Sequence, residues 1–288
     1  MSDDPLLGSL LDLLHELEGS GVPLILGGGY GLYLRQLRLQ EIDTRTFIDG
    51  SLWPRPRSTE DLDLFLQTDV VGNIGQMRFI RQALDRLGFN VVEEVKFMHF
   101  EKAVPPAGRV KIDLLTGPVT GAQARKRLHI KRPRVRPREP IELHAYLTDE
   151  ALAFEEEPFA VPVSGHLSGG QHYASKVLVP QPFTFLLMKL HAFRDRKNDV
   201  NKKLGQHHAL DLYRVVAMMT ESDEAVVRSL LDRHKAAMPV LEARRIVATD
   251  FRDKQSLGVL RLREHELFRQ EMDLDRFLSV LTEFFPTP

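Results

Sequence analysis

Three aspartates stand at strand-like positions where their carboxylates could hold metal ions. Asp61 and Asp63 alternate with leucines, so a strand over residues 61–66 places both carboxylates on one face. Two like charges about 7 Å apart along a strand are costly unless a cation neutralises them. Asp113 occupies a similar position in a later strand predicted over residues 109–115. Together the carboxylates could bind Mg²⁺ or Mn²⁺ and support in-line phosphoryl transfer.

Each carboxylate also has a plainer interpretation. An Asp-x-Asp pair occurs on solvated edge strands without any metal, and Asp113 could instead pair with Lys111 or with an arginine at a strand end. The presence of a third carboxylate on a second strand favours the metal site over these alternatives.

A glycine turn supplies a second constellation. Gly27, Gly28 and Gly29 follow an apolar stretch at residues 23–26 and precede a helix predicted over residues 30–39. Without side chains, backbone N–H groups can approach phosphate oxygens at a helix N-terminus, so this turn could receive a nucleoside triphosphate. A tight strand-to-helix turn also needs glycine for steric reasons alone. The spacing matches neither a Walker A loop nor the dinucleotide-binding fingerprint.

The elements that must position these residues divide the chain into two predicted domains, residues 1–180 and residues 181–288. The first domain is expected to be α/β, with helices at residues 6–17, 30–39 and 74–87 and strands at residues 23–26, 61–66, 89–95, 96–103, 109–115, 159–163 and 173–179. Residues 40–58 are expected to form a loop or insertion. The second domain is expected to be a helical bundle, with helices at residues 183–196, 204–219, 223–234, 239–251 and 274–285.

Composition narrows the class of protein. The chain has 288 residues, of which 43% are hydrophobic and 27% are charged, as in ordinary soluble globular proteins. It contains no cysteine, which excludes disulfides and thiolate metal sites. No apolar run approaches a membrane span, and the first residues do not resemble a secretory signal. These features predict a cytoplasmic protein.

A basic segment stands out against the net charge of -1. Eight basic residues occur between positions 125 and 138 without an acidic residue among them: Arg125, Lys126, Arg127, Lys131, Arg132, Arg134, Arg136 and Arg138. Prolines within the segment favour an extended or looped chain that could follow the phosphate backbone of RNA, such as a tRNA end. The alternative is a solvated hairpin that packs against the acidic residues 155–157.

The combination of motifs resembles a known superfamily. G-G-G-Y at a strand-to-helix turn, R-S-T-E-D-L-D-L-F, and I-D in a later strand are similar to the polymerase-beta-type nucleotidyltransferases. A helical half containing K-L-H-A-F-R and A-L-D-L-Y makes the chain most similar to the AbiEii-type and MenT-like members. The resemblance covers roughly residues 20–220. It implies an α+β fold, with a nucleotidyltransferase-type mixed sheet and flanking helices followed by a C-terminal helical bundle.

The resemblance also implies roles for individual residues. Gly28 and Gly29 would contact the triphosphate. Asp61 and Asp63 would hold both metals, whereas Asp113 would bind one metal and help to activate the acceptor. Lys189 and Asp211 would matter for activity, Lys189 by facing the triphosphate.

Lys189 and Asp211 also have a structural interpretation. Both lie in otherwise apolar helical segments, where an unpaired charge is costly, so a buried ion pair between them is the alternative to a catalytic role. Arg57 could contact nucleotide phosphate or could be an exposed loop arginine. His207 and His208 are adjacent and therefore point to different faces of a helix, which makes them poor metal ligands as a pair.

Three hypotheses follow. The first is a metal-dependent nucleotidyltransferase that moves a nucleoside monophosphate from an NTP to an RNA end, as a toxin-like enzyme with a cognate antitoxin. The second is an adenylyltransferase that acts on a small molecule or a protein. The third is a non-catalytic module that binds nucleic acid. Metal dependence separates the third from the others, and salt-sensitive RNA affinity separates the first from the second.

Overall fold

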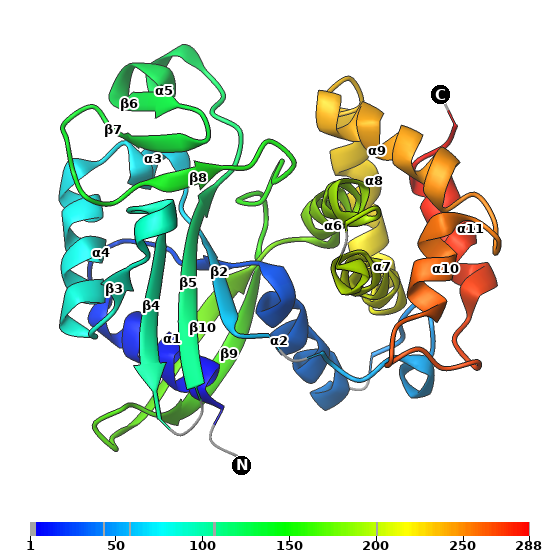
Figure 1. The fold of residues 1–288 in the computed structure, drawn as a ribbon, viewed down its shortest axis with the longest axis horizontal. Helices are drawn as coiled ribbons and strands as arrows, with labels where there is room; N and C mark the ends of the chain where they lie inside the picture. Colours follow the sequence, from blue (N-terminus) through cyan, green and yellow to red (C-terminus); the bar gives the residue numbers. More distant parts are fainter. Residues whose placement is uncertain (1–3, 43, 58, 106–107, 200, 288) are drawn as a thin grey trace. The chain divides into compact units, whose positions relative to one another are not determined.

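The computed structural model describes residues 4–42, 44–57, 59–105, 108–199 and 201–287, which form two compact units (Figure 1). A strand-rich unit comprises Met1–Gly31, Ser58–Asp149 and Glu157–Pro180, and a helical unit comprises Leu32–Arg57, Glu150–Glu156 and Gln181–Pro288. A mixed sheet with flanking helices in one unit and a helical bundle in the other confirm the predicted fold class. The domain boundary at residue 180 stays a prediction. Ser58, which belongs to the R-S-T-E-D-L-D-L-F motif, lies outside the described residues.

The strand-rich unit is built on one mixed sheet with the strand order β6-β7-β8-β5-β2-β1-β10-β9, and β4 joins β5 and β3 beside this path. The strands are β1 (Ile25–Leu26), β2 (Asp61–Phe65), β3 (Asn90–Val91), β4 (His99–Val104), β5 (Gly108–Thr116), β6 (Leu128–Lys131), β7 (Arg134–Pro137), β8 (Ala145–Leu147), β9 (Phe159–His166) and β10 (His172–Val179). Three pairs are parallel, namely β1 with β10, β2 with β5, and β5 with β8.

The two faces of this sheet differ in chemistry at its centre. Leu62, Leu64, Ile112 and Leu114 of β2 and β5 are almost completely buried on one face. The helix α1 (Pro5–Glu16), which contacts both strands as well as β9 and β10, covers that apolar face. The alternate positions of β2 and β5 carry the carboxylates and are partly exposed. Strand periodicity therefore presents the charged residues together on one face while the core fills the other.

The remaining helices of the strand-rich unit are α3 (Thr68–Val71), α4 (Ile74–Arg86) and α5 (Ala122–Arg127). The helix α4 begins where the Asn73 side chain accepts from the N–H groups of Gly75 and Gln76, an ordinary N-cap. The strand predicted over residues 89–95 was mostly wrong. Only β3 forms there, and Glu93–Val95 is a 3₁₀ turn, because the chain must reverse before it enters β4.

The helical unit packs its helices around α6 and α7. Its helices are α6 (Pro182–Arg196), α7 (Lys202–Ala217), α8 (Glu221–Arg233), α9 (Met238–Asp250), α10 (Leu257–Arg263) and α11 (Leu274–Phe284), of which α10 was not predicted. A chain of aromatic rings forms part of the core, with Phe193 4.9 Å from Phe251 and Tyr213 5.5 Å from Phe277 between centroids. The unit also contains most of α2 (Gly28–Glu41), which starts in the strand-rich unit.

The irregular segment after α2 packs into the helical unit. It contains one 3₁₀ turn, η1 (Gly50–Leu52), and agrees otherwise with the expected loop; Asp43 within it lies outside the described residues. Trp53 is 8% exposed and donates its indole N–H to the Ile48 carbonyl at 2.9 Å. Arg269 donates to the carbonyls of Ser51 and Trp53 at 2.7 and 2.9 Å. These contacts fix the chain that leads to Arg57.

Candidate functional site

The three aspartates come together on one face of the sheet, in a group that we call the strand site. Asp63 of β2 lies directly opposite Asp113 of β5, and Asp61 lies opposite Lys111. The antiparallel pairing of β4 with β5 brings His99 opposite Asp113. Because laterally paired residues point to the same face, all of these side chains share one surface.

Two basic groups, His99 and Lys111, lie close to the carboxylates of the strand site. His99 donates from Nδ1 to Oδ1 of Asp113 at 2.5 Å. Lys111 Nζ lies 3.7 Å from Asp61 Oδ1 and 4.0 Å from a Glu60 oxygen. Asp113 was expected to pair with Lys111 or an arginine if it were structural, but its partner is His99. The sequence analysis did not identify His99 as a member of the site.

Burial, hydrogen bonding and neighbouring charges shift the pKa values of Asp61 and His99 in the strand site. Burial raises the pKa of Asp61, and the neighbouring carboxylates of Asp113 and Glu60 raise it further, although Lys111 acts against them. The pKa of His99 is raised chiefly by its hydrogen bond to Asp113, and Asp63 and Asp61 add to the effect. Both shifts have the direction expected where negative charge exceeds positive charge.

The glycine turn meets the strand site through Asp63. Gly27 donates its N–H to the Asp63 carbonyl at 2.8 Å. Gly28 has a φ of +62°, and a Cβ at this position would overlap the carboxylate of Asp63. Since α2 starts at Gly28, the Asp63 carboxylate lies beside the first residue of this helix, the end at which helical N–H groups lack intrahelical acceptors. Glycine is therefore required both by the backbone conformation and by the close approach of Asp63.

These observations bear on whether a divalent cation suits the strand site. Carboxylate oxygens are the ligands that Mg²⁺ and Mn²⁺ prefer, and the glycine turn leaves room for the Asp63 carboxylate. Within the ranges that the structure describes, no three Asp, Glu or His side chains already converge as a ligand set. The Asp113 carboxylate pairs with the His99 ring in this structure. The donor chemistry thus suits a hard cation.

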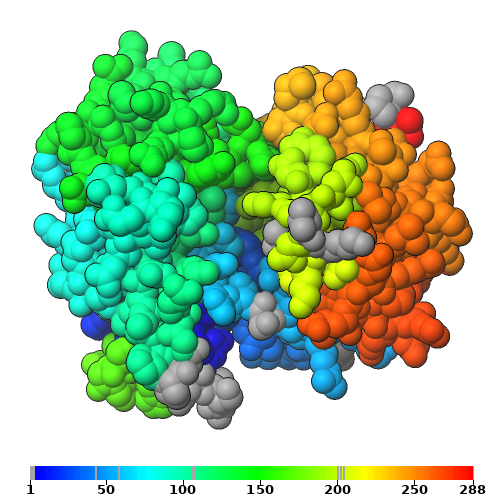
Figure 2. Space-filling model, in the orientation of Figure 1, coloured from blue at the N-terminus to red at the C-terminus, as the bar shows by residue number. Residues whose placement is uncertain are grey.

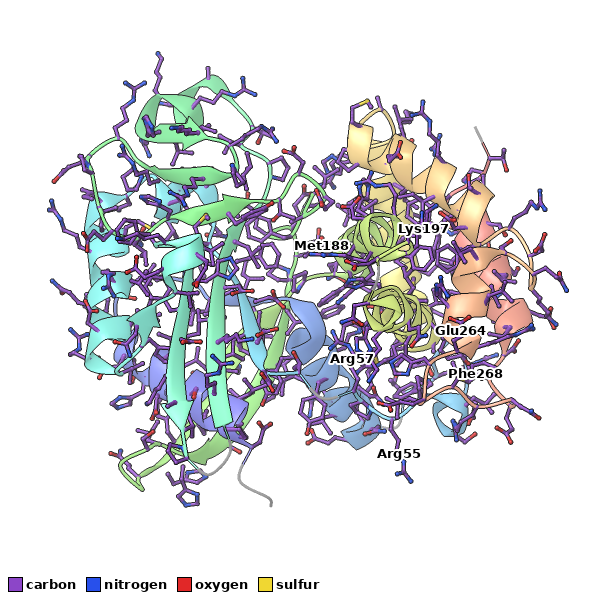
Figure 3. The ribbon with its side chains drawn as sticks, viewed as in Figure 1. Arg55, Arg57, Met188, Lys197, Glu264 and Phe268 are labelled. Carbon is purple, nitrogen blue, oxygen red and sulfur yellow. The ribbon has the colours of Figure 1, made fainter. Side chains whose placement is uncertain are left out.

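A second charged cluster, the helix site, lies within the helical unit. Asp211 of α7 is completely buried and accepts from Lys189 Nζ of α6 at 2.8 Å. Arg57, which Figure 3 labels, donates to the same oxygen from Nη2 at 3.2 Å and from Nε at 3.4 Å. Arg214 donates to the other oxygen at 3.2 Å and is held by Gln36, whose Oε1 accepts from its Nε and Nη2. Three cations therefore surround one carboxylate.

The charge balance of the helix site is opposite to that of the strand site. Burial alone would raise the pKa of Asp211, but Lys189, Arg57 and Arg214 hold it well below its usual range. Burial lowers the pKa of His208 on the same helix to about 3, and Lys189 contributes to this shift. Exposure of the three cations rises from 1% at Arg214 to 8% at Lys189 and 18% at Arg57, so the surplus positive charge reaches the surface through the last two.

The basic segment starts as the end of a helix and continues as a β-hairpin, so the expected extended chain is found from Leu128 onward but not at Arg125–Arg127. Arg125, Lys126 and Arg127 end α5, and the other basic residues lie on β6, β7 and their connections. Most remain exposed, and Figure 2 shows this region, in green, at the surface of the unit. Arg132 pairs with Asp149 at 2.5 Å, and Arg136 donates to two backbone carbonyls. Part of the hairpin's positive charge is thus already engaged locally.

The alternative partner for this hairpin was the acidic stretch at residues 155–157. Glu156 of that stretch forms ion pairs with Arg233 and with His234, the latter at 3.2 Å. Both partners belong to the helical unit, as Glu156 does. This acid is therefore accounted for without the basic hairpin.

Three residues of these clusters were missed by the sequence analysis, namely His99, Arg214 and Gln36. The numbers of the residues paired between β4 and β5 sum to 212, and this register places His99 opposite Asp113. Arg214 follows Asp211 by three residues, a spacing at which helical side chains meet. Gln36 carries no comparable signal, because its contact with Arg214 joins segments far apart in the chain.

Comparisons with known proteins agree with the motifs. The family described as nucleotidyl transferase AbiEii toxin, type IV toxin–antitoxin system, matches residues 47–283. No curated protein matches the chain. Among solved structures, the antibiotic-resistance factor ANT(2'')-Ia is 14% identical with a TM-score of 0.38, over 81% of this chain and 98% of that one. An antigenic nucleotidyltransferase-like protein from Paracoccidioides brasiliensis is 14% identical with a TM-score of 0.37, over 81% and 90% of the two chains.

Proposed function

Because the chain belongs to the AbiEii nucleotidyl transferase toxin family and is a nucleotidyltransferase, we propose that it transfers a nucleoside monophosphate from an NTP to an RNA end in a metal-dependent reaction. The observation that carries this proposal is the contact of the Asp63 carboxylate with the Gly28 backbone at the start of α2, beside Asp61 and Asp113. It joins a cation-binding group and a phosphate-binding group in one unit.

In this proposal Asp61, Asp63 and Asp113 hold Mg²⁺ or Mn²⁺. When bound, such ions neutralise the charge of the phosphates and stabilise the pyrophosphate that leaves. His99 fixes the orientation of Asp113 through their hydrogen bond, and Lys111 offsets part of the charge of Asp61. Burial and, after it, the carboxylates of Asp113 and Glu60 raise the pKa of Asp61, which supports the assignment because a bound cation would favour the charged carboxylate.

The triphosphate is assigned to the Gly27-Gly28-Gly29 turn of the strand-rich unit. The first N–H groups of α2 favour an anion. A separate role is proposed for the helical unit: Lys189 and Arg57 belong to a cluster that has more cations than carboxylates, so each can attract an anionic group while Asp211 holds both in place. This interpretation keeps the Lys189–Asp211 ion pair and adds a role for it.

The acceptor is assigned to RNA on the basis of the exposed basic hairpin. The family's description also supports a toxin whose activity a cognate antitoxin restrains. Within the described ranges, none of the helices has the length and apolar character needed to cross a lipid bilayer. Transfer to a small molecule or a protein is the outcome that would redirect the assignment.

Incubation of the protein with Mg²⁺, each labelled NTP and total RNA tests the proposal directly. Label should appear in RNA with at least one NTP and should disappear when EDTA is added. Asp61→Asn and Asp63→Asn should each reduce transfer by more than about 100-fold, since even the groups that merely orient metal ligands are worth 10- to 100-fold. Circular dichroism should show that both variants remain folded.

Asp85→Asn serves as the matched control, because Asp85 lies on α4 of the same unit and pairs with Arg81 one helical turn away. This variant should transfer label at the normal rate. Normal turnover by both strand-site variants, or full activity in EDTA, would contradict the metal assignment. Label in protein or in a small molecule, with none in RNA, would instead support the adenylyltransferase hypothesis.

A further inference from the structure

The outward side chains of the basic hairpin continue across the sheet towards the strand site. Lys131 of β6 lies opposite Arg134 of β7, which in turn lies opposite Tyr146 of β8. Tyr146 pairs with Leu115 of β5. Paired residues share a face, and Leu115 is two positions from Asp113, so this row ends on the face that carries the aspartates. The strands involved are adjacent in Figure 1.

In this row of paired residues, Tyr146 lies between the cations of the hairpin and the strand that carries Asp113. Its side chain is 40% exposed. Its two neighbours in β8, Ala145 and Leu147, are buried on the opposite face. Strand geometry places the Cα atoms of Tyr146 and Asp113 within about 8 Å of each other. An exposed aromatic ring thus lies about one nucleotide from the strand site.

Other aromatic groups adjoin Tyr146 on this face. His144, two residues earlier and on the same side, packs edge-on against Phe97 with 5.4 Å between centroids. Burial, together with Arg134 and Arg136, lowers the pKa of His144 to about 4, so its ring is neutral at physiological pH. Phe97 adopts a φ of +69°, which is costly for an aromatic residue.

We propose that this face binds the single-stranded end of a nucleic acid, with bases stacked on Tyr146 and phosphates on Lys131 and Arg134. The proposal rests on the proposed function, because it assigns where the acceptor lies before transfer. Aromatic stacking together with cations is the recognition chemistry of single strands. An acidic protein would use the cations but has no need of an exposed tyrosine between them and the aspartates.

Binding of a labelled 12-nucleotide single-stranded RNA, measured by fluorescence anisotropy, tests the role of Tyr146. Tyr146→Ala should weaken binding by about 10-fold or more, whereas Tyr146→Phe should bind almost as the wild type, since it keeps the ring. The matched control is Ile130→Ala. Ile130 is similarly exposed, at 38%, but alternates with Lys131 and faces the other side of β6. Wild-type affinity in Tyr146→Ala, or an equal loss in Ile130→Ala, would overturn the proposal.

The cations are tested through the salt dependence of the same binding. A double variant, Lys131→Gln with Arg134→Gln, should lower the log–log salt slope by about 1.4, because each phosphate contact to a single strand contributes about 0.7. Arg132→Gln is the control, since Arg132 is paired with Asp149. Equal effects of the double variant and the control would contradict the placement of the strand. A single-stranded DNA of the same sequence shows whether the surface distinguishes ribose from deoxyribose. Binding of either nucleic acid that depends on Tyr146 supports the proposed surface.

Two further comparisons separate this proposal from the proposed function. Asp63→Asn protein should bind the RNA as tightly as the wild type while it fails to transfer label. If transfer to RNA occurs but Tyr146→Ala leaves both affinity and transfer unchanged, the activity stands and this surface is wrong. If the RNA binds through Tyr146 but no NTP is transferred, the surface stands and the activity is wrong. Equal affinity for heparin and RNA in wild type and Tyr146→Ala alike would indicate a general polyanion surface and overturn the proposal.

Discussion

The carboxylates of the strand site and the carboxylate of the helix site have opposite electrostatic surroundings. In the strand site, Asp61, Asp63 and Asp113 share one face with Lys111 and His99, and Glu60 lies 4.0 Å from Lys111. In the helix site, Lys189, Arg57 and Arg214 surround Asp211 alone. One cluster therefore has negative charge to spare, and the other has positive charge to spare.

This difference shows that the charges within a cluster of ionised side chains need not balance one another. A one-to-one pair such as Lys197–Asp250, with contacts of 2.7 and 2.8 Å, balances its own charge and predicts nothing about ligands (Figure 3 labels Lys197). Neither candidate cluster is balanced in this way. A cation would balance the strand site and an anion would balance the helix site, and each cluster can be tested separately.

The largest expected effect comes from removing the single anion of the helix site. Asp211→Asn would leave three buried or half-buried cations without their carboxylate, and we expect a loss of roughly 3–5 kcal/mol in the free energy of unfolding. Lys189→Gln leaves Asp211 with two arginines. It should cost no more than about 1 kcal/mol, because it also relieves repulsion among the cations. Urea unfolding followed by circular dichroism measures both values.

Lys197→Gln provides the control for this comparison, because it removes the only cation of a one-to-one pair in the same unit. It should destabilise the protein more than Lys189→Gln does and should leave triphosphate affinity unchanged. Lys189→Gln should weaken triphosphate binding. An equal loss of stability in Lys189→Gln and Asp211→Asn, with unchanged triphosphate affinity, would show that the Lys189–Asp211 pair is only structural.

The second prediction concerns the contact between Gly28 and Asp63. Gly28→Ala should reduce transfer by about 10- to 100-fold, as loss of ligand orientation does at metal sites, because the new methyl group must displace the Asp63 carboxylate. Gly88→Ala is the matched control: Gly88 also has a positive φ, of 78°, but nothing lies within 4 Å of the point that a Cβ would occupy there. Both variants share the backbone strain of about 1 kcal/mol.

Only Gly28→Ala should therefore impair Mg²⁺-dependent triphosphate binding, which isothermal titration calorimetry measures. Similar binding by the two alanine variants would mean that the carboxylate moves aside freely. The close approach of Asp63 to the turn would then have no functional meaning, and the strand site would lose its link to the phosphates.

The sequence was most informative where one element contains the whole pattern. Alternation along residues 61–66 predicted that Asp61 and Asp63 share a face, and the structure agrees over Asp61–Phe65. The strand holding Asp113 was also predicted, but its neighbour His99 depends on the register of a second strand. Pairing across strands is set by turn geometry, which alternation within one strand does not encode.

The basic segment shows the same limit. Its charge was evident, but the order of residues along the chain could not separate Arg132, which pairs with Asp149, from Arg134, which faces outward. Nor could it bring Tyr146 into the row, since β8 was not predicted and Tyr146 follows Arg138 by eight residues. In the helical unit, Asp211 was expected to have one cation, and the second and third come from segments distant in sequence or hidden among apolar neighbours.

The smallest expected effect is a pH dependence that reports the surplus positive charge of the helix site. Burial lowers the pKa of His208 to about 3, and Lys189 and Arg57 lower it too, while Asp211 acts in the opposite direction. An unfolded histidine has a pKa of about 6.5. Between these values the unfolded chain binds one proton more than the folded chain, so stability falls as the pH falls from about 6.5 to 3. The slope from this group is at most about 1.4 kcal/mol per pH unit.

His208→Gln should flatten that slope, because glutamine has no proton to gain on unfolding. Urea unfolding at pH 7, 6 and 5 measures the change, and His172→Gln, at an exposed position on β10, controls for the loss of a histidine as such. His144 titrates abnormally in the same range and leaves a remaining slope in both variants. In a protein that keeps His208, Lys189→Gln should raise the pKa of His208, since it removes a neighbouring cation. The pH range over which His208 lowers the stability should therefore become narrower. If this pH range is the same in the wild type and in Lys189→Gln, burial alone keeps His208 neutral. The helix site would then no longer be distinguished by its surplus positive charge.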